Sequence, residues 1–347
     1  MALQVDIEKT LGSFRLRVNF RAETGVLALL GASGCGKSMT LKCIAGVERP
    51  DRGRIVLHDR VLYDSGKGVC LPPQQRKVGF LFQQYALFPH MTVRQNIACG
   101  VRGKAGKNEA VERMIRSMRL DGLEDKKPAQ LSGGQQQRTA LARILVNDPD
   151  VLLLDEPFSA LDSHLRFQME QEVRRVIRQF QKPVVLVSHN RDEVFRLSDE
   201  IAVMGEGQIE IIGPRHAVFG NPETRRGAVL TGCKNVSPAF PAGEGRVRAE
   251  EWGIELAFPA GQSLPAYVGI RMHDIRPAQA EEEENAFWCR VEEEIENPFS
   301  VTLMLRPEGA DAAQALGWEM DKNTWRSLRA ERVRICLPPD KLLPLKA

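Results

Sequence analysis

The sequence lacks long hydrophobic runs, a secretion signal and a charge excess of either sign. Its apolar stretches break after about five residues, whereas a helix that spans a membrane needs about 20. The first residues, MALQVD, show neither the basic nor the apolar segment of a signal peptide. Over 347 residues the net charge is +3, too little to draw the chain to nucleic acid or acidic lipid. We therefore expect no nucleic-acid partner, and attachment to a membrane only through a protein that spans it.

Closely spaced cysteine pairs are also missing. The seven cysteines are Cys35, Cys43, Cys70, Cys99, Cys233, Cys289 and Cys336. Their odd number and the absence of a CxxC motif are atypical of a disulfide framework or a zinc site. We expect reduced thiols in a protein of the cytosol.

Apolar periodicity over the first two thirds of the chain predicts an α/β fold. Residues 3–7 and 14–20 alternate between apolar and polar side chains, which is typical of a half-buried hairpin. Three runs are apolar on both faces, as in parallel strands covered on both sides: residues 26–30, 151–154 and 184–187. An apolar stripe at helical spacing lies between the last two runs, and residues 93–146 are expected to be largely helical. Strand, helix and strand in that order predict a parallel α/β layer.

The pattern changes after about residue 230. Short alternating stretches are separated by glycine and proline, and acidic clusters appear at residues 281–284 and 292–294. We expect two domains, an α/β domain over residues 1–231 and a small β-rich, barrel-like domain over residues 232–347.

The stretch GASGCGKS, residues 31–38, follows the first of the buried runs and fits the pattern GxxxxGK[ST]. Its glycines let successive backbone N–H groups point inward around an anion, and the following helix adds its positive end. Lys37 is placed to reach the β- and γ-phosphates of a nucleotide, and Ser38 to bind Mg²⁺. A chance glycine turn is the alternative, but the predicted strand before it and helix after it favour a nucleotide site.

The stretch LLLDEP supplies two further carboxylates at the end of a predicted buried strand. Asp155 would lie beside the glycine loop, where it can hold Mg²⁺ through water. Glu156 is placed to polarise an attacking water as a general base. A solvated strand end with two acidic residues is the alternative.

A second anion-binding helix start is predicted at LSGGQQQR, residues 131–138. The two phosphate-facing loops lie about a hundred residues apart in the sequence. One nucleotide does not need two such loops from the same chain. We therefore expect a two-fold, head-to-tail homodimer in which the second loop of each chain covers the nucleotide of its partner.

These three stretches resemble the Walker A, signature and Walker B motifs of ATP-binding cassette (ABC) ATPases. Three shorter stretches follow the same family order: Gln83 resembles the Q-loop glutamine, Asp162 the D-loop aspartate and His189 the H-loop histidine that contacts the γ-phosphate. Without the other motifs, each of these residues has a structural explanation instead. Gln83 would be an ordinary surface amide, His189 would be a histidine at the end of a strand, and Asp162 would contribute to the start of a helix. The resemblance implies a RecA-like core, an antiparallel β subdomain and a helical subdomain.

The resemblance also implies an ATPase that uses ATP and Mg²⁺. The implied catalytic residues are Glu156, His189, Lys37 and Gln83, and the implied metal ligands are Ser38, Gln83 and Asp155. The implied nucleotide contacts are Gly31, Ala32, Ser33, Gly34, Cys35, Gly36, Lys37, Ser38, Met39, Phe14, Ser132, Gly133, Gly134, Gln135 and Asp162. Phe14 is the residue expected to stack on adenine, although its alternation with Leu16 and Val18 also fits a side chain that faces the core. The Cys35 side chain is expected to point away from the phosphates.

The stretch YALFPHMTV, residues 85–93, resembles bacterial importer ATPases of the sugar, sulfate, molybdate and iron group. The resemblance implies that this segment docks on membrane permease subunits at the cytoplasmic side of the membrane, and that a substrate-binding protein takes part indirectly. Phe88 and Leu87 could also cap the core of the helical subdomain.

The stretch GIRMHDI, residues 269–275, resembles the G-[IV]-R-P-E-D-[IV] box of the appended TOBE-like domain, which binds oxyanions in some relatives. Met272 and His273 replace the usual proline and glutamate, so the match is partial. Arg271 and Lys234 are possible partners of an oxyanion, or solvated surface cations.

Residues 54–73 most resemble molybdate importer ATPases, with sulfate importers next. We therefore expect an ATPase subunit that powers oxyanion import, with molybdate first and sulfate, thiosulfate or another substrate as alternatives. A non-transport ABC ATPase of DNA repair or translation is the alternative from another class. DNA-repair members separate the two Walker motifs by a long coiled coil, and the translation factors carry two cassettes. A P-loop GTPase is disfavoured because no NKxD motif is present.

Overall fold

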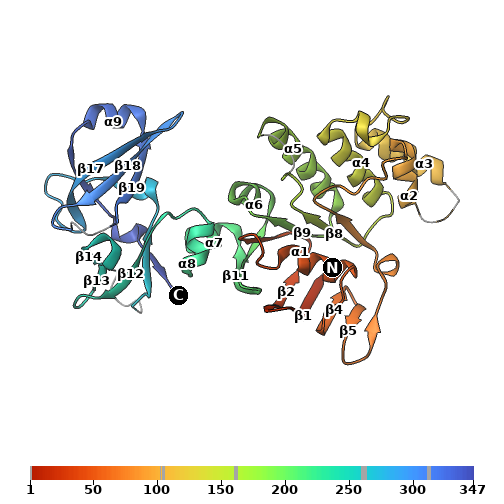
Figure 1. Ribbon diagram of the computed structural model, residues 1–347, viewed down its shortest axis with the longest axis horizontal. Coiled ribbons are helices and arrows are strands. Elements are labelled where there is room, and N and C mark those ends of the chain that lie inside the picture. Colours follow the sequence, from red (N-terminus) through yellow and green to blue (C-terminus); the bar gives the residue numbers. More distant parts are fainter. Residues whose placement is uncertain (1, 102, 104–105, 160–162, 259–263, 311–313) are drawn as a thin grey trace. The chain divides into compact units, whose positions relative to one another are not determined.

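The computed structural model describes residues 2–101, 103, 106–159, 163–258, 264–310 and 314–347. The chain divides into two compact units, Met1–Arg215 and His216–Ala347, which are described separately (Figure 1). None of the helices in the described ranges combines the length and the apolar character that crossing a bilayer requires.

An 11-stranded mixed sheet forms the centre of the first unit. Strands in the order β10-β3-β9-β8-β7 are parallel, and β3, β8 and β9 contain the three doubly apolar runs predicted from the sequence. Their bounds are β3 (Gly25–Gly31), β7 (Val78–Leu81), β8 (Val151–Asp155), β9 (Pro183–Ser188) and β10 (Glu200–Gly205). Parallel pairing brings the carboxyl ends of these strands to one edge, where ligands bind in open α/β sheets.

The rest of this sheet is an extension in which most neighbouring strands pair antiparallel. β1 (Leu3–Leu11) pairs with β2 (Phe14–Ala22) as the predicted hairpin, and alternate side chains of both strands enter the core. The other strands of the extension are β4 (Arg52–Leu57), β5 (Arg60–Asp64), β6 (Val69–Cys70) and β11 (Gln208–Pro214). One apolar cluster runs beneath both parts of the sheet and ties them into one unit.

Helices complete the first unit. α1 (Lys37–Ala45) starts within the glycine loop and α6 (Arg191–Leu197) follows β9. α2 (Val93–Gly100), α3 (Lys107–Ser117) and α4 (Gly133–Leu145) gather on one side of the unit, where Figure 1 shows them with part of α5 (Ser163–Phe180). Their shared core includes Val93, Ile97, Ile115 and Val176. The predicted α/β class, with an antiparallel and a helical subdomain, is confirmed.

The second unit contains two five-stranded sheets around a core of its own. The first sheet has β12 (Asn235–Pro241), β13 (Arg246–Ala249), β14 (Ile254–Ala257), β15 (Tyr267–Ile270) and β21 (Leu343–Leu345). The second has β16 (Arg276–Pro277), β17 (Ala286–Glu296), β18 (Ser300–Pro307), β19 (Leu316–Asp321) and β20 (Arg332–Cys336). Three helices belong to this part of the chain: α7 (Arg215–Gly220), α8 (Arg225–Leu230) and α9 (Lys322–Leu328).

The division between the units falls at residue 215, before the expected boundary at 231. The reason is the packing of α8, whose Ala228 shares a small apolar cluster with Cys233 and Leu345. The backbone N–H of Arg225 also donates to the carbonyl of Lys346 at 3.0 Å. These contacts join residues 216–231 to the β-rich unit.

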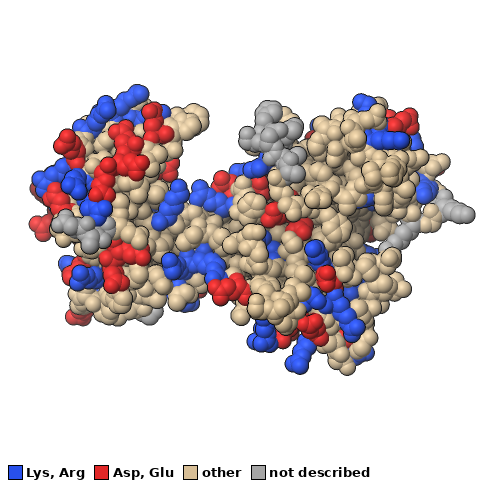
Figure 2. Space-filling view, viewed as in Figure 1, with Lys and Arg blue, Asp and Glu red and all other residues tan. Residues whose placement is uncertain are grey.

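Charged side chains of both signs are interspersed over each unit on the face drawn in Figure 2. This agrees with the small net charge of the chain.

Candidate active site

The glycine loop connects β3 to α1 at the carboxyl edge of the parallel strands. Gly36 has φ 104°, and a Cβ there would lie 2.6 Å from Leu16 Cδ1, so only glycine fits. Lys37 is 5 % exposed, and its ammonium donates to the carbonyls of Gly31 at 2.7 Å and Ala32 at 2.8 Å. A buried cation whose hydrogen-bond partners are neutral fits an anionic ligand such as a phosphate group.

A hydroxyl and a carboxylate meet beside this loop. Ser38 Oγ donates to Asp155 Oδ1 at 2.7 Å and so joins the start of α1 to the end of β8. Burial raises the pKa of the Asp155 carboxyl, with the neighbouring Glu156 adding to the effect, although the hydrogen bond from Ser38 opposes it. A desolvated carboxylate paired with a hydroxyl is the oxygen-donor chemistry that Mg²⁺ prefers, so these residues fit that ion.

Glu156 and His189 face each other at the same edge. His189 Nδ1 lies 3.1 Å from Glu156 Oε1. Glu156 has φ 45°, a left-handed conformation that is uncommon outside glycine and concentrates at functional sites. Its backbone N–H donates to Val187 in β9 at 2.9 Å. The strands thus place a carboxylate and an imidazole together beside the Ser38–Asp155 pair.

Gln83 is joined to this group through Ser159. Its Nε2 donates to Ser159 Oγ at 3.3 Å, and Ser159 Oγ donates to the carbonyl of Glu156 at 3.0 Å. The exposed Gln83 side chain therefore reaches the backbone of the proposed base, and the described contacts do not join it to Ser38 or Asp155.

The second predicted loop lies at the start of α4. Ser132 caps this helix in a reciprocal capping box: its Oγ accepts from the Gln135 N–H at 3.3 Å, and its N–H donates to Gln135 Oε1 at 3.0 Å. A Cβ on Gly134 would lie 2.9 Å from Met169 Sδ, so the Met169 side chain of α5 packs closely against this glycine. Gly133 begins the helix, at the end where the helix dipole is positive.

The other expected nucleotide contacts are distributed around the glycine loop. Phe14 and Met39 are partly buried against the core, and the Phe14 ring lies close to Gly36, 3.2 Å from a Cβ built there. Cys35 is 7 % exposed and packs into the same core. Ala32, Ser33 and Gly34 are exposed. Asp162 lies outside the described residues.

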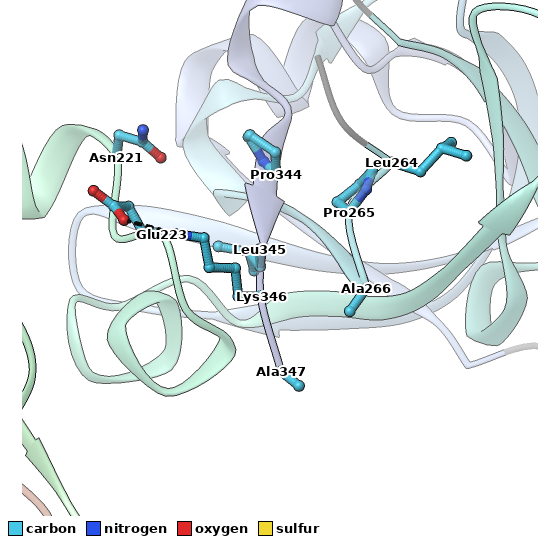
Figure 3. Close-up of a pocket in the computed structure, with 9 residues that line it drawn as sticks. All are labelled: Asn221, Glu223, Leu264, Pro265, Ala266, Pro344, Leu345, Lys346 and Ala347. Atoms are coloured by element: carbon cyan, nitrogen blue, oxygen red, sulfur yellow. Dashed lines mark hydrogen bonds and ion pairs between the residues drawn. The ribbon is translucent and has the colours of Figure 1, made fainter. Parts of the chain in front are cut away.

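The second unit offers no ready site for an oxyanion at the predicted residues. The Arg271 guanidinium donates to the carbonyls of Thr231, at 2.7 Å, and Phe219, so part of its hydrogen-bonding capacity holds backbone within this unit. Lys234 is exposed. A pocket of about 520 Å³ lies elsewhere in this unit (Figure 3) and contains Lys346, whose ammonium is paired with Glu223 at 3.2 Å.

Three residues that support the site through hydrogen bonds were not predicted from the sequence: Glu193, Tyr85 and Arg143. Glu193 is buried and accepts from Ser188 Oγ at 2.7 Å, directly before His189. Burial raises the pKa of Glu193, and the negative charge of Glu170 adds to it. Tyr85 and Arg143 support the turn after Gln83. Their partners are backbone groups distant in sequence, and no local pattern in the sequence identifies such contacts.

Comparisons with known proteins agree with this geometry. The family model described as ABC transporter matches residues 16–159. The molybdenum import ATP-binding protein ModC of Rhodospirillum rubrum is 42% identical over 223 residues, or 64% of this chain and 60% of that protein. This match therefore covers less than two thirds of the relative. The spermidine/putrescine import ATP-binding protein PotA of Nitratidesulfovibrio vulgaris is 39% identical over 80% of this chain and 78% of its own length.

A solved structure provides a third comparison. The dimeric post-hydrolysis structure of an ATP-binding cassette bound to ADP and Pi matches with a TM-score of 0.52 and 26% identity, over 62% of this chain and 99% of that one. Other relatives are named for import of Fe(3+) ions, in Haemophilus influenzae, and of sulfate/thiosulfate, in Vibrio vulnificus. The chain therefore belongs to the ABC transporter family and contains an ATP-binding cassette.

Proposed function

We propose that the protein is the ATP-hydrolysing subunit of a bacterial ABC importer. The observation that carries the proposal is the convergence at one sheet edge of two pairs, Ser38 with Asp155 and Glu156 with His189. The first pair suits a metal bound to phosphate, and the second suits activation of water against a phosphate.

Each residue has a distinct role in this proposal. The glycine loop and Lys37 bind the β- and γ-phosphates, and Ser38 and Asp155 would hold Mg²⁺, which supplies charge neutralisation on the phosphate oxygens. Glu156 accepts a proton from the attacking water. His189, hydrogen-bonded to Glu156, orients that carboxylate and contacts the γ-phosphate. Most of the rate enhancement comes from positioning and charge, because phosphoryl transfer needs little covalent chemistry from the protein.

The chain acts as a head-to-tail homodimer in this proposal. Residues 132–135 form the capped start of α4 and lie on a different subdomain from the glycine loop. In a two-fold dimer they cover the partner's nucleotide, so ATP stabilises the closed state through contacts with both chains. The dimeric state of the solved cassette supports this arrangement.

The permease is proposed to dock on the segment after Gln83. Asn96 in α2 holds this segment. Its side-chain oxygen accepts from the Phe88 N–H, and its side-chain nitrogen donates to the carbonyls of Phe88 and Met91. Phe88 is 46 % exposed on this held segment, as a docking side chain must be. A pocket of about 380 Å³ that includes Phe82 and Arg143 opens beside it and offers a place for a permease helix. This docking would place the protein at the cytoplasmic side of the membrane.

Molybdate is the proposed cargo, supported by the names of two relatives at 42% and 39% identity. Sulfate, Fe(3+) and polyamines are alternatives, since relatives of similar identity carry those names. The cargo would be presented by a substrate-binding protein. Residues 232–347 are proposed as a regulatory domain.

Phosphate release by the purified full-length chain tests the proposed activity. We expect Mg²⁺-dependent ATP hydrolysis that Lys37→Ala abolishes. Reconstitution with a candidate permease and binding protein then tests the cargo, because only the cognate oxyanion should stimulate hydrolysis. A parent protein without ATPase activity would contradict the proposal.

A further inference from the structure

The turn after Gln83 contains two consecutive strained residues. Tyr85 has φ 56° and Ala86 has φ 47°, and neither is glycine. Side chains with a Cβ rarely adopt this left-handed region, and such conformations persist only where the surroundings enforce them. The turn must therefore be held by contacts from outside the segment.

Arg143, near the end of α4, provides the first of these contacts. Its guanidinium donates to the carbonyl of Tyr85 at 3.1 Å and to that of Ala86 at 2.9 Å, and it lies over the Phe88 ring at 5.1 Å. The last turn of α4, which contains Arg143, therefore fixes the strained turn, while Ser132 caps the opposite end of the same helix.

The Tyr85 side chain provides the second contact. It is 6 % exposed, and its hydroxyl donates to the carbonyl of Pro157 at 3.3 Å. Gln137 Nε2, also from α4, donates to the same carbonyl at 3.2 Å.

Pro157 directly follows Glu156, the proposed base. The Glu156 carbonyl is already held by the N–H and Oγ of Ser159, at 3.2 Å and 3.0 Å. The bonds to Pro157 fix the next peptide, so the left-handed backbone of Glu156 is anchored on its following side by Tyr85 and Gln137. A shift of the turn would change the backbone that aims the carboxylate.

We propose that Tyr85 is a positioning residue for Glu156. Its hydroxyl links the segment proposed to dock on the permease with the peptide after the general base, and Arg143 keeps the turn in the conformation that makes this link. Displacement of the docking segment then moves the base relative to the attacking water. The inference rests on the proposed ATPase function and adds a route, separate from Gln83, between docking segment and base.

Tyr85→Phe tests this directly, because it removes the hydroxyl and keeps the ring. Tyr63→Phe is a matched control: Tyr63 is 1 % exposed and its hydroxyl also donates to a proline carbonyl, that of Pro50, at 2.7 Å. Measurements of kcat and KM for Mg-ATP, with melting temperatures, are made on the full-length chain. We expect both variants to melt earlier, and only Tyr85→Phe to lower kcat, by about twofold to tenfold with KM unchanged.

Equal kcat values for the parent, Tyr85→Phe and Tyr63→Phe would overturn the inference, as would an equal loss in both variants, because that indicates a general effect on folding. A parent that does not hydrolyse ATP would overturn the proposed function and the inference with it.

A second pair of variants tests the turn independently of the hydroxyl. Arg143→Gln should lower kcat because the strained carbonyls lose their donor. Adding Ala86→Gly should restore part of that loss, since glycine accepts a left-handed φ at low cost. The absence of any rescue by Ala86→Gly would contradict the role assigned to the held turn.

Discussion

Single side chains carry most of the chemistry, and Glu156 is the residue with the clearest assigned role. Its left-handed backbone and its contact with His189 place one carboxylate in the position proposed for the group that polarises water. We expect this carboxylate to take no part in binding ATP, so a substitution at Glu156 should impair hydrolysis without weakening ATP binding.

Glu156→Gln is expected to lower kcat by a factor of about 10² or more, because the amide cannot accept the proton, and to leave ATP binding intact. Phosphate release and binding of a fluorescent ATP analogue measure the two effects. Glu223→Gln is the control, since Glu223 is also left-handed at φ 53° but lies in the second unit. Parental turnover in Glu156→Gln would show that another group is the base.

Asp155, the carboxylate proposed to hold Mg²⁺, is expected to lower the stability of the fold when it is charged. Its folded-state pKa is raised by burial, so the native state binds a proton more readily than the unfolded chain does. The charged form therefore destabilises the fold fully above the folded-state pKa, and this penalty disappears as the pH falls below the ordinary carboxyl value.

We expect Asp155→Asn to melt at a higher temperature than the parent at neutral pH in EDTA, with a difference that shrinks on acidification, while Mg²⁺-dependent hydrolysis is lost. Asp64→Asn is a suitable control: Asp64 is similarly buried, but it accepts two backbone N–H bonds from Gly66 and Lys67 and should gain no stability. A lower melting temperature for Asp155→Asn at every pH would contradict this explanation.

At the scale of elements, helix starts determine where anions can bind. The capping box of Ser132 and Gln135 fixes the first turn of α4. Ser132→Ala should cost about 1 kcal/mol of stability and also lower ATP turnover, because Ser132 is proposed to contact the partner's nucleotide.

Asp321 offers the comparison, since it caps α9 by accepting from the N–H groups of Asn323 and Thr324 at 3.0 Å. Asp321→Ala should cost similar stability and leave turnover unchanged. Urea unfolding and phosphate release distinguish the two outcomes, and an equal effect of both variants on turnover would remove the special role of Ser132.

Patterns within one element were predictable from the sequence, whereas contacts between elements were not. The doubly apolar runs identified β3, β8 and β9, and the alternation from Leu3 identified the first hairpin. The short edge strand β7 was missed because Val78–Leu81 gives too few residues for a periodic signal. The role of Arg271 was also missed, because a side chain that caps distant carbonyls looks like any other arginine in sequence.

The same limit applies to the site. Motif spacing predicted that Lys37, Ser38, Asp155 and Glu156 belong to one site, and the structure brings Ser38 and Asp155 together because these residues lie within or next to one loop. The Tyr85–Pro157 bond joins residues that are 72 positions apart, and left-handed conformations at non-glycine residues leave no trace in composition.

At the scale of the whole molecule, each of the two units has its own apolar core. We expect two thermal transitions in calorimetry, and Mg-ATP should raise the midpoint temperature of the first unit's transition only. At a hundredfold excess over Kd, bound Mg-ATP adds about 2.7 kcal/mol to the free energy of unfolding of that unit. A single transition, or an equal shift of both, would show that the units unfold as one.

The central claim is that two chains share each ATP. A photoreactive ATP with the reactive group on the γ-phosphate tests this claim in a mixture of two chains. One chain is size-tagged and carries Lys37→Ala, so its own glycine loop cannot bind ATP. The other chain carries Glu156→Gln, so it binds ATP without hydrolysing it. The account predicts labelling of the tagged chain within residues 132–135. Labelling confined to the Glu156→Gln chain would contradict the shared site.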